Sequence, residues 1–281
     1  MNFIRLVAGS TDANMGVLYR SAATAMDAYC KWITMQSSVG ERSCDEMLAR
    51  AKQHALTWFD GVSPEYLALP GAIVDADIVV GPTLGALAQL ARQPSSGAGT
   101  NPLGEAISKC ADDLRRALGG LSERAGALAA AMRNSVQMLE TDGQDFLHRS
   151  QEEERRLREL SMRMSRLQGE AHAAESARCL DRNRIRALNM DIDQVRRDVQ
   201  NASRRTDLTG EAAQRSHDAL GGTNYLARFW DAAAGDARAS IATLVRLQRE
   251  PARLADVDMA NAHAHWTRMV RDFEQVARAV G

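Results

Sequence analysis

Apolar residues recur at helical spacing along most of this chain of 281 residues. The longest unbroken pattern is a heptad repeat from Ile107 to Leu139, in which Ile107, Leu114, Leu121 and Leu128 take d positions and Ala111, Leu118, Ala125, Met132 and Leu139 take a positions. A second heptad runs from Leu157 to Ala174 after a displacement of four residues, and the same frame continues from Ile185 to Ala202. The displacement, across 141–154, indicates either a stutter or a hairpin tip. These stripes predict long helices that pack antiparallel.

Shorter helical patterns flank the long ones. Ser43 and Glu46 have the spacing of a capping box, which predicts that a helix begins there. The pair Gly221–Gly222 is expected to break the helical path, and Pro251 is expected to close the helix that follows. The expected short helices are 12–37, capped by Thr11 or Asp12; 43–59, closed by Asp60, Gly61 and Pro64; 225–247; and 256–280.

The segment 66–92 is the most hydrophobic part of the chain, yet helix breakers and acidic residues interrupt it. A simple membrane span needs about 20 uninterrupted apolar residues, so the segment is not expected to be one. Asp75 and Asp77 permit two interpretations: a pH-sensitive carboxylate pair that enters a membrane once neutralised, or acids at a polar helix end or in a loop. The residues expected to divide the segment are Pro70, Gly71, Asp75, Asp77, Gly81 and Pro82.

A stretch rich in Ser, Gly and Pro at 93–104 has the composition of a linker. Residues 1–103 are expected to hold the N-terminal helices and the broken hydrophobic segment. Residues 104–281 are expected to hold the long coiled-coil helices and the closing tail helices, packed as one elongated bundle. Composition agrees with this all-α fold class, because Ala, Leu and Arg favour helices and aromatic residues make up only 5% of the chain.

The sequence offers no recognisable chemistry. Basic residues, 35 in all, nearly balance 36 acidic ones, so no nucleic acid is expected as a partner. The four cysteines lack zinc-ligand spacing, and a bridge between Cys30 and Cys44 is left open. His263 and His265 diverge on a helix, so no metal site is predicted. Without a nucleotide-binding, metalloprotease or nucleophile-elbow motif, no catalytic residue and no cofactor are predicted, and the chain is expected not to be an enzyme.

Two stretches carry a resemblance to a known family. They are Gly221–Trp230, with the sequence GGTNYLARFW, and His265–Val270, with the sequence HWTRMV. Together with the order of short helices, hydrophobic segment, long coils and closing helices, they resemble α-helical pore-forming toxins of the cytolysin A, haemolysin BL and xenorhabdolysin type. The resemblance covers the whole chain. It implies a soluble bundle that changes conformation, oligomerises and acts at target membranes.

The resemblance also implies partners, namely a second toxin subunit, further copies of this chain and the lipid of a target membrane. This sequence lacks the long uncharged hydrophobic tongue of single-component members, which favours a partner-dependent component. Residues 1–8 are interrupted by Arg5 and show no cleaved secretory signal, so we expect synthesis in the cytoplasm and release by another route.

Two sets of residues follow from the resemblance. The membrane-proximal or latch candidates are Ile73, Val74, Asp75, Asp77, Ile78, Val79, Val80, Leu84, Leu87 and Leu90. The candidates for helix packing and subunit contacts are Leu114, Leu118, Leu121, Leu128, Met132, Leu157, Leu160, Met164, Leu167, Trp230 and Trp266.

A second interpretation fits the composition equally well. The chain could be a non-enzymatic coiled-coil scaffold or a secretion-system adaptor that binds partners through its seams. Membrane affinity and the conversion of soluble monomers into large rings separate the two interpretations, because a scaffold has no reason to show either property.

Overall fold

The computed structural model describes residues 15–92, 102–176 and 181–280. Every regular element in these ranges is a helix, which confirms the predicted all-α class with long helices between shorter ones. The expected caps Thr11 and Asp12 lie outside the described residues, as does most of the expected linker. The elements are α1 (Met15–Met35), α2 (Arg42–Thr57), the π-helix η1 (Trp58–Val62), α3 (Ser63–Leu90), α4 (Pro102–Glu175), α5 (Arg182–Arg249), the 3-10 helix η2 (Pro251–Asp256) and α6 (Met259–Val280).

The chain forms two compact units, each built from separate segments. Unit 1 comprises Met1–Asp27, Leu56–Val136 and Gly221–Gly281, and unit 2 comprises Ala28–Ala55 and Gln137–Leu220. The long helices α4 and α5 contribute to both units. The division of the sequence into residues 1–103 and 104–281 stays a prediction.

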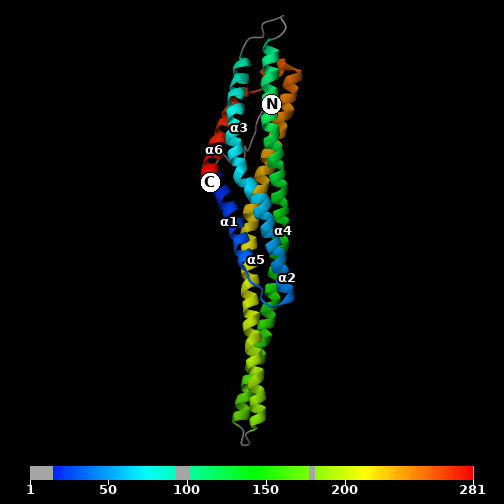
Figure 1. The fold of residues 1–281 in the computed structure, drawn as a ribbon, viewed down its shortest axis with the longest axis vertical. Coiled ribbons are helices and arrows are strands. Elements are labelled where there is room, and N and C mark those ends of the chain that lie inside the picture. Colours follow the sequence, from blue (N-terminus) through cyan, green and yellow to red (C-terminus); the bar gives the residue numbers. More distant parts are fainter. Residues whose placement is uncertain (1–14, 93–101, 177–180, 281) are drawn as a thin grey trace. The chain divides into compact units, whose positions relative to one another are not determined.

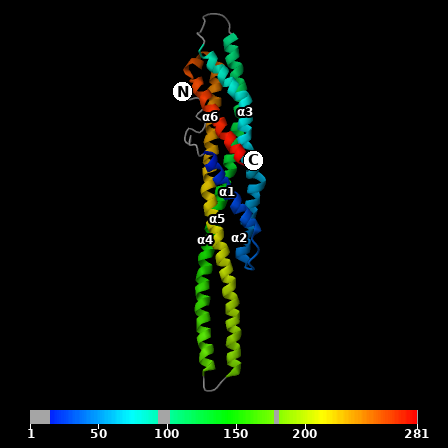
Figure 2. The ribbon, with the colours of Figure 1, turned by 90° about the vertical axis from the view of Figure 1, so that its left-hand side faces the viewer.

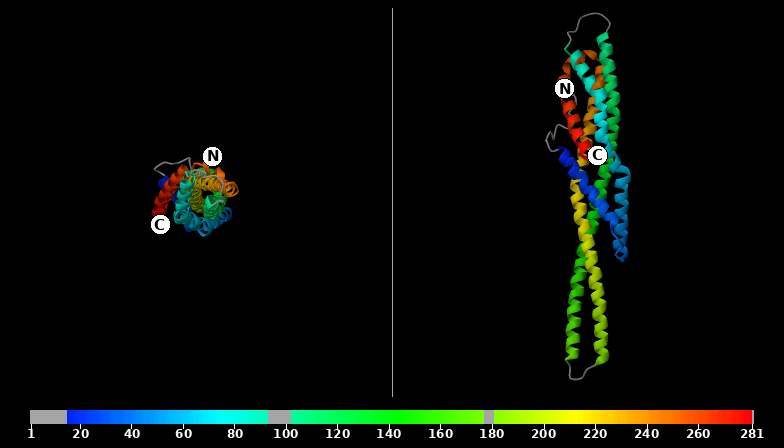
Figure 3. Two further views of the ribbon diagram at one scale, coloured as in Figure 1. Left: turned by 90° about the horizontal axis from the view of Figure 1, so that it is seen from above. Right: turned by 60° about the vertical axis from the view of Figure 1, so that its left-hand side comes forward.

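Aromatic side chains form the core of unit 1. Trp230 from α5 is fully buried, and its ring centroid lies 6.1 Å from that of Tyr19 on α1 and 5.7 Å from that of Phe273 on α6. Trp58 is also fully buried, and its indole N–H donates to the carboxylate of Asp27 at 2.8 Å. Helices α3 and α6 lie side by side in this unit (Figure 1 and Figure 3). The sequence pattern thus buries one stripe of each helix against the others.

Interior prolines do not divide α3, so this expectation from the sequence is wrong. Pro70 has no N–H, and the carbonyl of Tyr66, one turn earlier, therefore loses its helical donor. The buried hydroxyl of Tyr19 on α1 donates to this carbonyl oxygen at 2.8 Å. A donor from another helix thus replaces the missing backbone bond at Pro70, and α3 runs unbroken from Ser63 to Leu90.

The chain also stays helical where Asp60, Gly61 and Pro64 were expected to end a helix. The π-helix Trp58–Val62 joins α2 directly to α3. Such a turn accommodates one extra residue without ending the helix. Pro64 lies in the first turn of α3, where its missing N–H costs little.

The glycine pair of α5 lies inside a continuous helix, so the predicted break at Gly221–Gly222 is wrong. Gly221 has open space where a Cβ would lie, whereas a Cβ on Gly222 would lie 2.8 Å from the Cα of Ala22. Gly222 is therefore needed for the close approach of α1 to α5. The predicted helix end at Pro251 is confirmed, because α5 ends at Arg249.

In unit 2, the contributing parts of α4 and α5 run antiparallel (Figure 2). Ser216 on α5 donates to the carbonyl of Leu139 on α4 at 2.7 Å, and Gly143 faces Ser216 closely. Because α4 continues through 141–154, the displacement there is a stutter, and the hairpin turns between Glu175 and Arg182. The buried core nearest this turn consists of Ala171, Leu188 and Ile192, with Met164, Leu167 and Ala174 partly buried against it.

Glu41 caps α2, in place of the capping box predicted from Ser43 and Glu46. The Glu41 carboxylate accepts the backbone N–H of Cys44 at 3.0 Å and the hydroxyl of Ser43. Glu46 instead forms an exposed ion pair with Arg42. The bridge between Cys30 and Cys44 that the sequence left open is not formed, although both thiols are buried.

Candidate functional site

The membrane-proximal or latch candidates lie on two opposite faces of α3. The inward face packs inside unit 1, and its candidates are Ile73, Val80, Leu84 and Leu87, each at most 5% exposed. On the opposite face, Ile78 is 79% exposed and Val79 is 44% exposed. Val74 and Leu90 are intermediate. A helix that is apolar all round is normally covered on every side, but α3 is covered on one.

Asp77 and Trp266 form a polar contact between α3 and α6. The indole N–H of Trp266 donates to Asp77 Oδ1 at 2.6 Å. The same carboxylate oxygen lies 2.5 Å from the position that a Cβ on Gly81 would take, so Gly81 leaves room for it. Both Asp75 and Asp77 are inside a continuous helix, which excludes the loop interpretation of these acids. Asp77 faces α6, whereas Asp75 is exposed, so they do not act as a pair.

One helical stretch of the described chain, Arg42–Leu90, is long and apolar enough to cross a membrane. Within this stretch, only 33% of the most apolar 18-residue segment is buried. Core helices of soluble proteins pass the same test of length and composition. The continuity of α3 through Pro70 and Pro82 is what makes the stretch long enough, and the sequence prediction of a divided segment missed it.

The predicted packing positions fall into two groups. Those in unit 1 are almost fully buried, apart from the partly exposed Leu121: Leu114, Leu118, Leu128, Met132, Trp230 and Trp266. Those toward the turn of the α4–α5 hairpin in unit 2 are half-buried: Leu157, Leu160, Met164 and Leu167. In two-stranded packing a seam keeps part of its surface exposed, because no third helix covers it.

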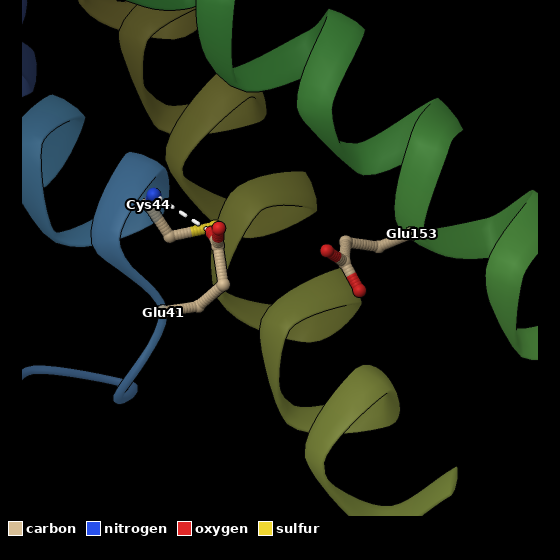
Figure 4. Close-up of side chains that lie close together, drawn as sticks. All are labelled: Glu41, Cys44 and Glu153. Carbon is tan, nitrogen blue, oxygen red and sulfur yellow. Dashed lines mark hydrogen bonds between the residues drawn. The ribbon is translucent and has the colours of Figure 1, made fainter. Parts of the chain in front are cut away.

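A cluster of charged side chains in unit 2 was not predicted. It consists of Glu41, Cys44, Arg149, Glu153 and Arg205, here named the Arg149 cluster. Arg149 Nη2 lies 2.8 Å from both Glu41 Oε2 and Glu153 Oε1, and Arg149 Nε donates to Cys44 Sγ at 3.3 Å. Figure 4 shows Glu41 and Cys44 facing Glu153 of α4. Arg149 thus ties the start of α2 to α4.

Hydrogen bonds and a nearby cation favour the ionised form of Glu41 in the Arg149 cluster. Burial opposes ionisation of Glu41, but the backbone N–H of Cys44, the Ser43 hydroxyl and Arg149 together lower the pKa of Glu41 to about 2. Glu153 is 1% exposed, and Arg205 Nη2 lies 2.9 Å from its Oε2 without hydrogen-bond geometry. Removing either cation would leave the buried carboxylate of Glu153 with only one of its two cationic partners.

The ligand atoms of Glu41, Cys44 and Glu153 lie within 4.8 Å of one another, a spacing that a metal ion could span. Arg149 already occupies the space among them with its donors, and Arg205 adds a second positive charge. Burial raises the pKa of the Cys44 thiol, which outweighs the opposite effect of Arg149, whereas metal binding needs a thiolate. The donor set fits an ion-pair network better than a cation site.

A second polar contact holds the other end of α2 to α4. Asp142, whose side chain is 1% exposed, accepts Arg50 Nε at 3.1 Å and lies 2.7 Å from His54 Nδ1. Arg50 also pairs with Asp145. Apolar burial by α2 is modest and consists of Cys44, Leu48, Ala51 and Ala55. Ionic contacts therefore contribute much of the attachment of α2 within unit 2.

The sequence held one signal for the Arg149 cluster. Glu153 lies four residues before Leu157 and therefore at a d position of the second heptad frame, where a charge needs a partner. The identity of the partners could not be read, because Glu41 and Arg205 are far from Glu153 in the sequence.

Comparison with known proteins adds a likeness of fold. No model of a protein family matches the chain, and no curated protein matches it in sequence. Soluble AhlC, of the tripartite α-pore-forming toxin AHL from Aeromonas hydrophila, is 14% identical over 95% of this chain and 98% of AhlC, with a TM-score of 0.51. The pre-pore form of AhlB from the same toxin is 11% identical over 94% of this chain and 96% of AhlB, with a TM-score of 0.54. The chain therefore has, over nearly its whole length, the fold of these α-pore-forming toxin components.

Proposed function

We propose that this chain is a component of a multi-part α-pore-forming toxin. In this proposal it is released from the cell that makes it, changes conformation, oligomerises and acts at a target membrane with a partner subunit. The observation that carries the proposal is the shared fold with AhlC and AhlB, which extends over at least 94% of this chain. Both of those proteins belong to a tripartite toxin.

In this proposal α3 is the membrane-proximal or latch element, and its contact with α6 must open. Opening would break the bond between Asp77 and Trp266 and expose the inward apolar face of α3. The helix would then present apolar side chains on its inward face as well as on its outward face. An ionised Asp at the centre of a membrane-spanning helix costs about 2.5–3.5 kcal/mol on insertion scales, and α3 has two, Asp75 and Asp77. This cost favours action with a partner subunit.

The coil positions would serve at different stages. The half-buried seam of unit 2, which includes Leu157 and Leu160, is accessible for subunit contacts in the soluble form. The positions in unit 1, such as Leu114 and Leu118, are covered within the same chain. They would meet another subunit only after the helices around them rearrange.

The test is dye release from liposomes by the purified chain, with and without lysate of the native host as a source of partner subunits. A double variant, Gly85→Cys with His263→Cys, places one thiol on each helix where α3 and α6 meet, because a Cβ on Gly85 would lie 3.8 Å from the tip of the His263 ring. A short bis-methanethiosulfonate reagent bridges the two thiols through reducible disulfides, and mass spectrometry verifies the cross-link. The single variant Gly85→Cys is the matched control.

The proposal predicts leakage accompanied by rings in electron micrographs. Leakage should be lost in the cross-linked double variant and restored by a reducing agent, while the control leaks under both conditions. Absence of leakage and of lipid binding under every condition would refute the toxin role and favour the coiled-coil scaffold. Leakage that the cross-link leaves unchanged would refute the role of α3 as a latch.

A further inference from the structure

The outward face of α3 is an apolar surface with a single charge near its centre. Its residues are Leu67, Ala68, Asp75, Ile78, Val79 and Pro82, all of them exposed. The spacing of these residues places them on one side of the helix, opposite the face that packs in unit 1. From Leu67 to Pro82 the face is about 23 Å long, at the 1.5 Å rise of a helix. Exposed apolar residues on soluble proteins are usually scattered singly. A continuous exposed apolar face is unusual and marks an interaction site.

Asp75 gives this face its specificity. In the described part of the chain, its exposed carboxylate forms no ion pair with a Lys, Arg or His side chain. Covering the face would remove the carboxylate from water, which is costly unless a cation pairs with it. A lipid tail supplies no cation, whereas a protein helix can present one among apolar side chains.

Pro82 adds a second polar requirement. As with Pro70, the proline has no N–H, so the carbonyl of Ile78 loses its helical donor. At Pro70 the hydroxyl of Tyr19 replaces that donor. Ile78 is 79% exposed on the outward face, so a helix that covers this face would also reach the backbone around Ile78. The way α1 meets α3 at Pro70 shows what a partner helix would do at Pro82.

We propose that the outward face of α3 binds a helix of the partner subunit that carries an Arg among apolar residues. The guanidinium pairs with Asp75, and its planar fork has further donors that can reach the Ile78 carbonyl. The flanking apolar side chains cover Ile78 and Val79. The inference rests on the proposed function for the existence of a partner subunit, and it assigns that partner a chemistry.

The test uses two synthetic amphipathic helices with a leucine stripe, one with Arg at its centre and one with Glu at the same place. Fluorescence anisotropy measures binding of each labelled peptide to the full chain. We expect the Arg peptide to bind at least about tenfold more tightly than the Glu peptide, because paired and like charges at a buried contact differ by more than that. Asp75→Arg should reverse the preference. Glu170→Arg, which makes the same charge change at an exposed site of α4, should leave it unchanged.

A further variant distinguishes a partner helix from two other possible occupants of this face, namely lipid and a second copy of the chain. Ile78→Ser, at a side chain that is 79% exposed, should weaken binding of both peptides without loss of helix content. Equal binding of the two peptides, or a preference that survives Asp75→Arg, overturns the inference. Binding of phosphatidylcholine vesicles that Ile78→Ser abolishes, without any peptide preference, would assign the face to lipid. Self-association that Ile78→Ser abolishes would assign it to a second copy.

These outcomes are distinct from those of the toxin test. Peptide binding is measured without a membrane. If the Arg peptide is preferred but no leakage occurs, the toxin role is overturned and the proposed binding surface on α3 still stands. If leakage occurs but neither peptide is preferred, the proposed binding surface on α3 is overturned and the toxin role still stands.

Discussion

The adjacent glycines of α5 should respond to the same substitution in opposite directions. Gly→Ala in a helix gains about 1 kcal/mol of stability from helix propensity. At Gly222 the new Cβ would lie 2.8 Å from the Cα and 2.9 Å from the carbonyl oxygen of Ala22, and backbone atoms cannot rotate away as a side chain can. Such overpacking costs about 1–3 kcal/mol. At Gly221 there is no atom to meet.

The propensity gain cancels when the two variants are compared, so their difference isolates the contact with α1. Gly221→Ala should be the more stable by about 1–3 kcal/mol. One kcal/mol shifts the melting temperature by about 2–4 °C in chains of 150–250 residues. Thermal unfolding followed by circular dichroism should therefore separate the variants by several degrees, with Gly221→Ala at or above the wild type. Equal melting temperatures would refute the close approach of α1 to α5.

Three further predictions concern stability, measured by urea unfolding of the full chain. Arg149→Met should cost about 3–5 kcal/mol, because it leaves the carboxylate of Glu153 buried without its main partner; a loss below about 1 kcal/mol would contradict the proposed burial. The folded-state pKa of Glu41 is about 2, below the reference of 4.5, so its stabilisation is complete above pH 4.5 and is lost as the pH falls toward 2; Glu41→Gln should flatten that part of the pH profile, and an unchanged profile would exclude this source. Tyr19→Phe should cost about 1–3 kcal/mol, and the loss should shrink when Pro70→Ala restores the backbone donor; additive losses would show that the hydroxyl does not serve that carbonyl.

The long helices could be predicted because their signal repeats. Each heptad of Leu, Ala and Met is weak evidence alone, but the pattern from Ile107 to Leu139 accumulates over many turns. The stutter could not be distinguished from a hairpin tip, because both displace the frame by the same number of residues. Only the continuity of α4 decides between them.

Proline and glycine residues that were expected to break helices were the main source of error. The destabilisation that such a residue causes locally can be offset by a contact from elsewhere in the fold. Pro70 is tolerated in α3 because Tyr19, which is 47 residues away from Tyr66 in the sequence, supplies the missing donor. Gly222 marks a tight helix contact rather than a break. In both cases the compensating partner is on α1, and no local rule could identify it.

The candidate site was predicted in part for a similar reason. The sequence singled out the hydrophobic segment and both acids, but not that Asp77 faces Trp266 while Asp75 faces outward. Residues two apart on a helix diverge by about 200°, so a continuous α3 separates them. That continuity was the part of the prediction that failed.

The covering of α3 by α6 has a consequence for synthesis on the ribosome. The first residue of α6, Met259, follows the end of α3 at Leu90 by 169 residues. At about 5–20 residues per second, the inward face of α3 waits roughly 10–30 s before synthesis of the helix that covers it begins. During that interval Ile73, Val80 and Leu84 are available to chaperones and to other nascent chains. A ribosome-bound fragment that stops before Met259 should therefore bind a hydrophobic chaperone through α3 more strongly than the finished chain does.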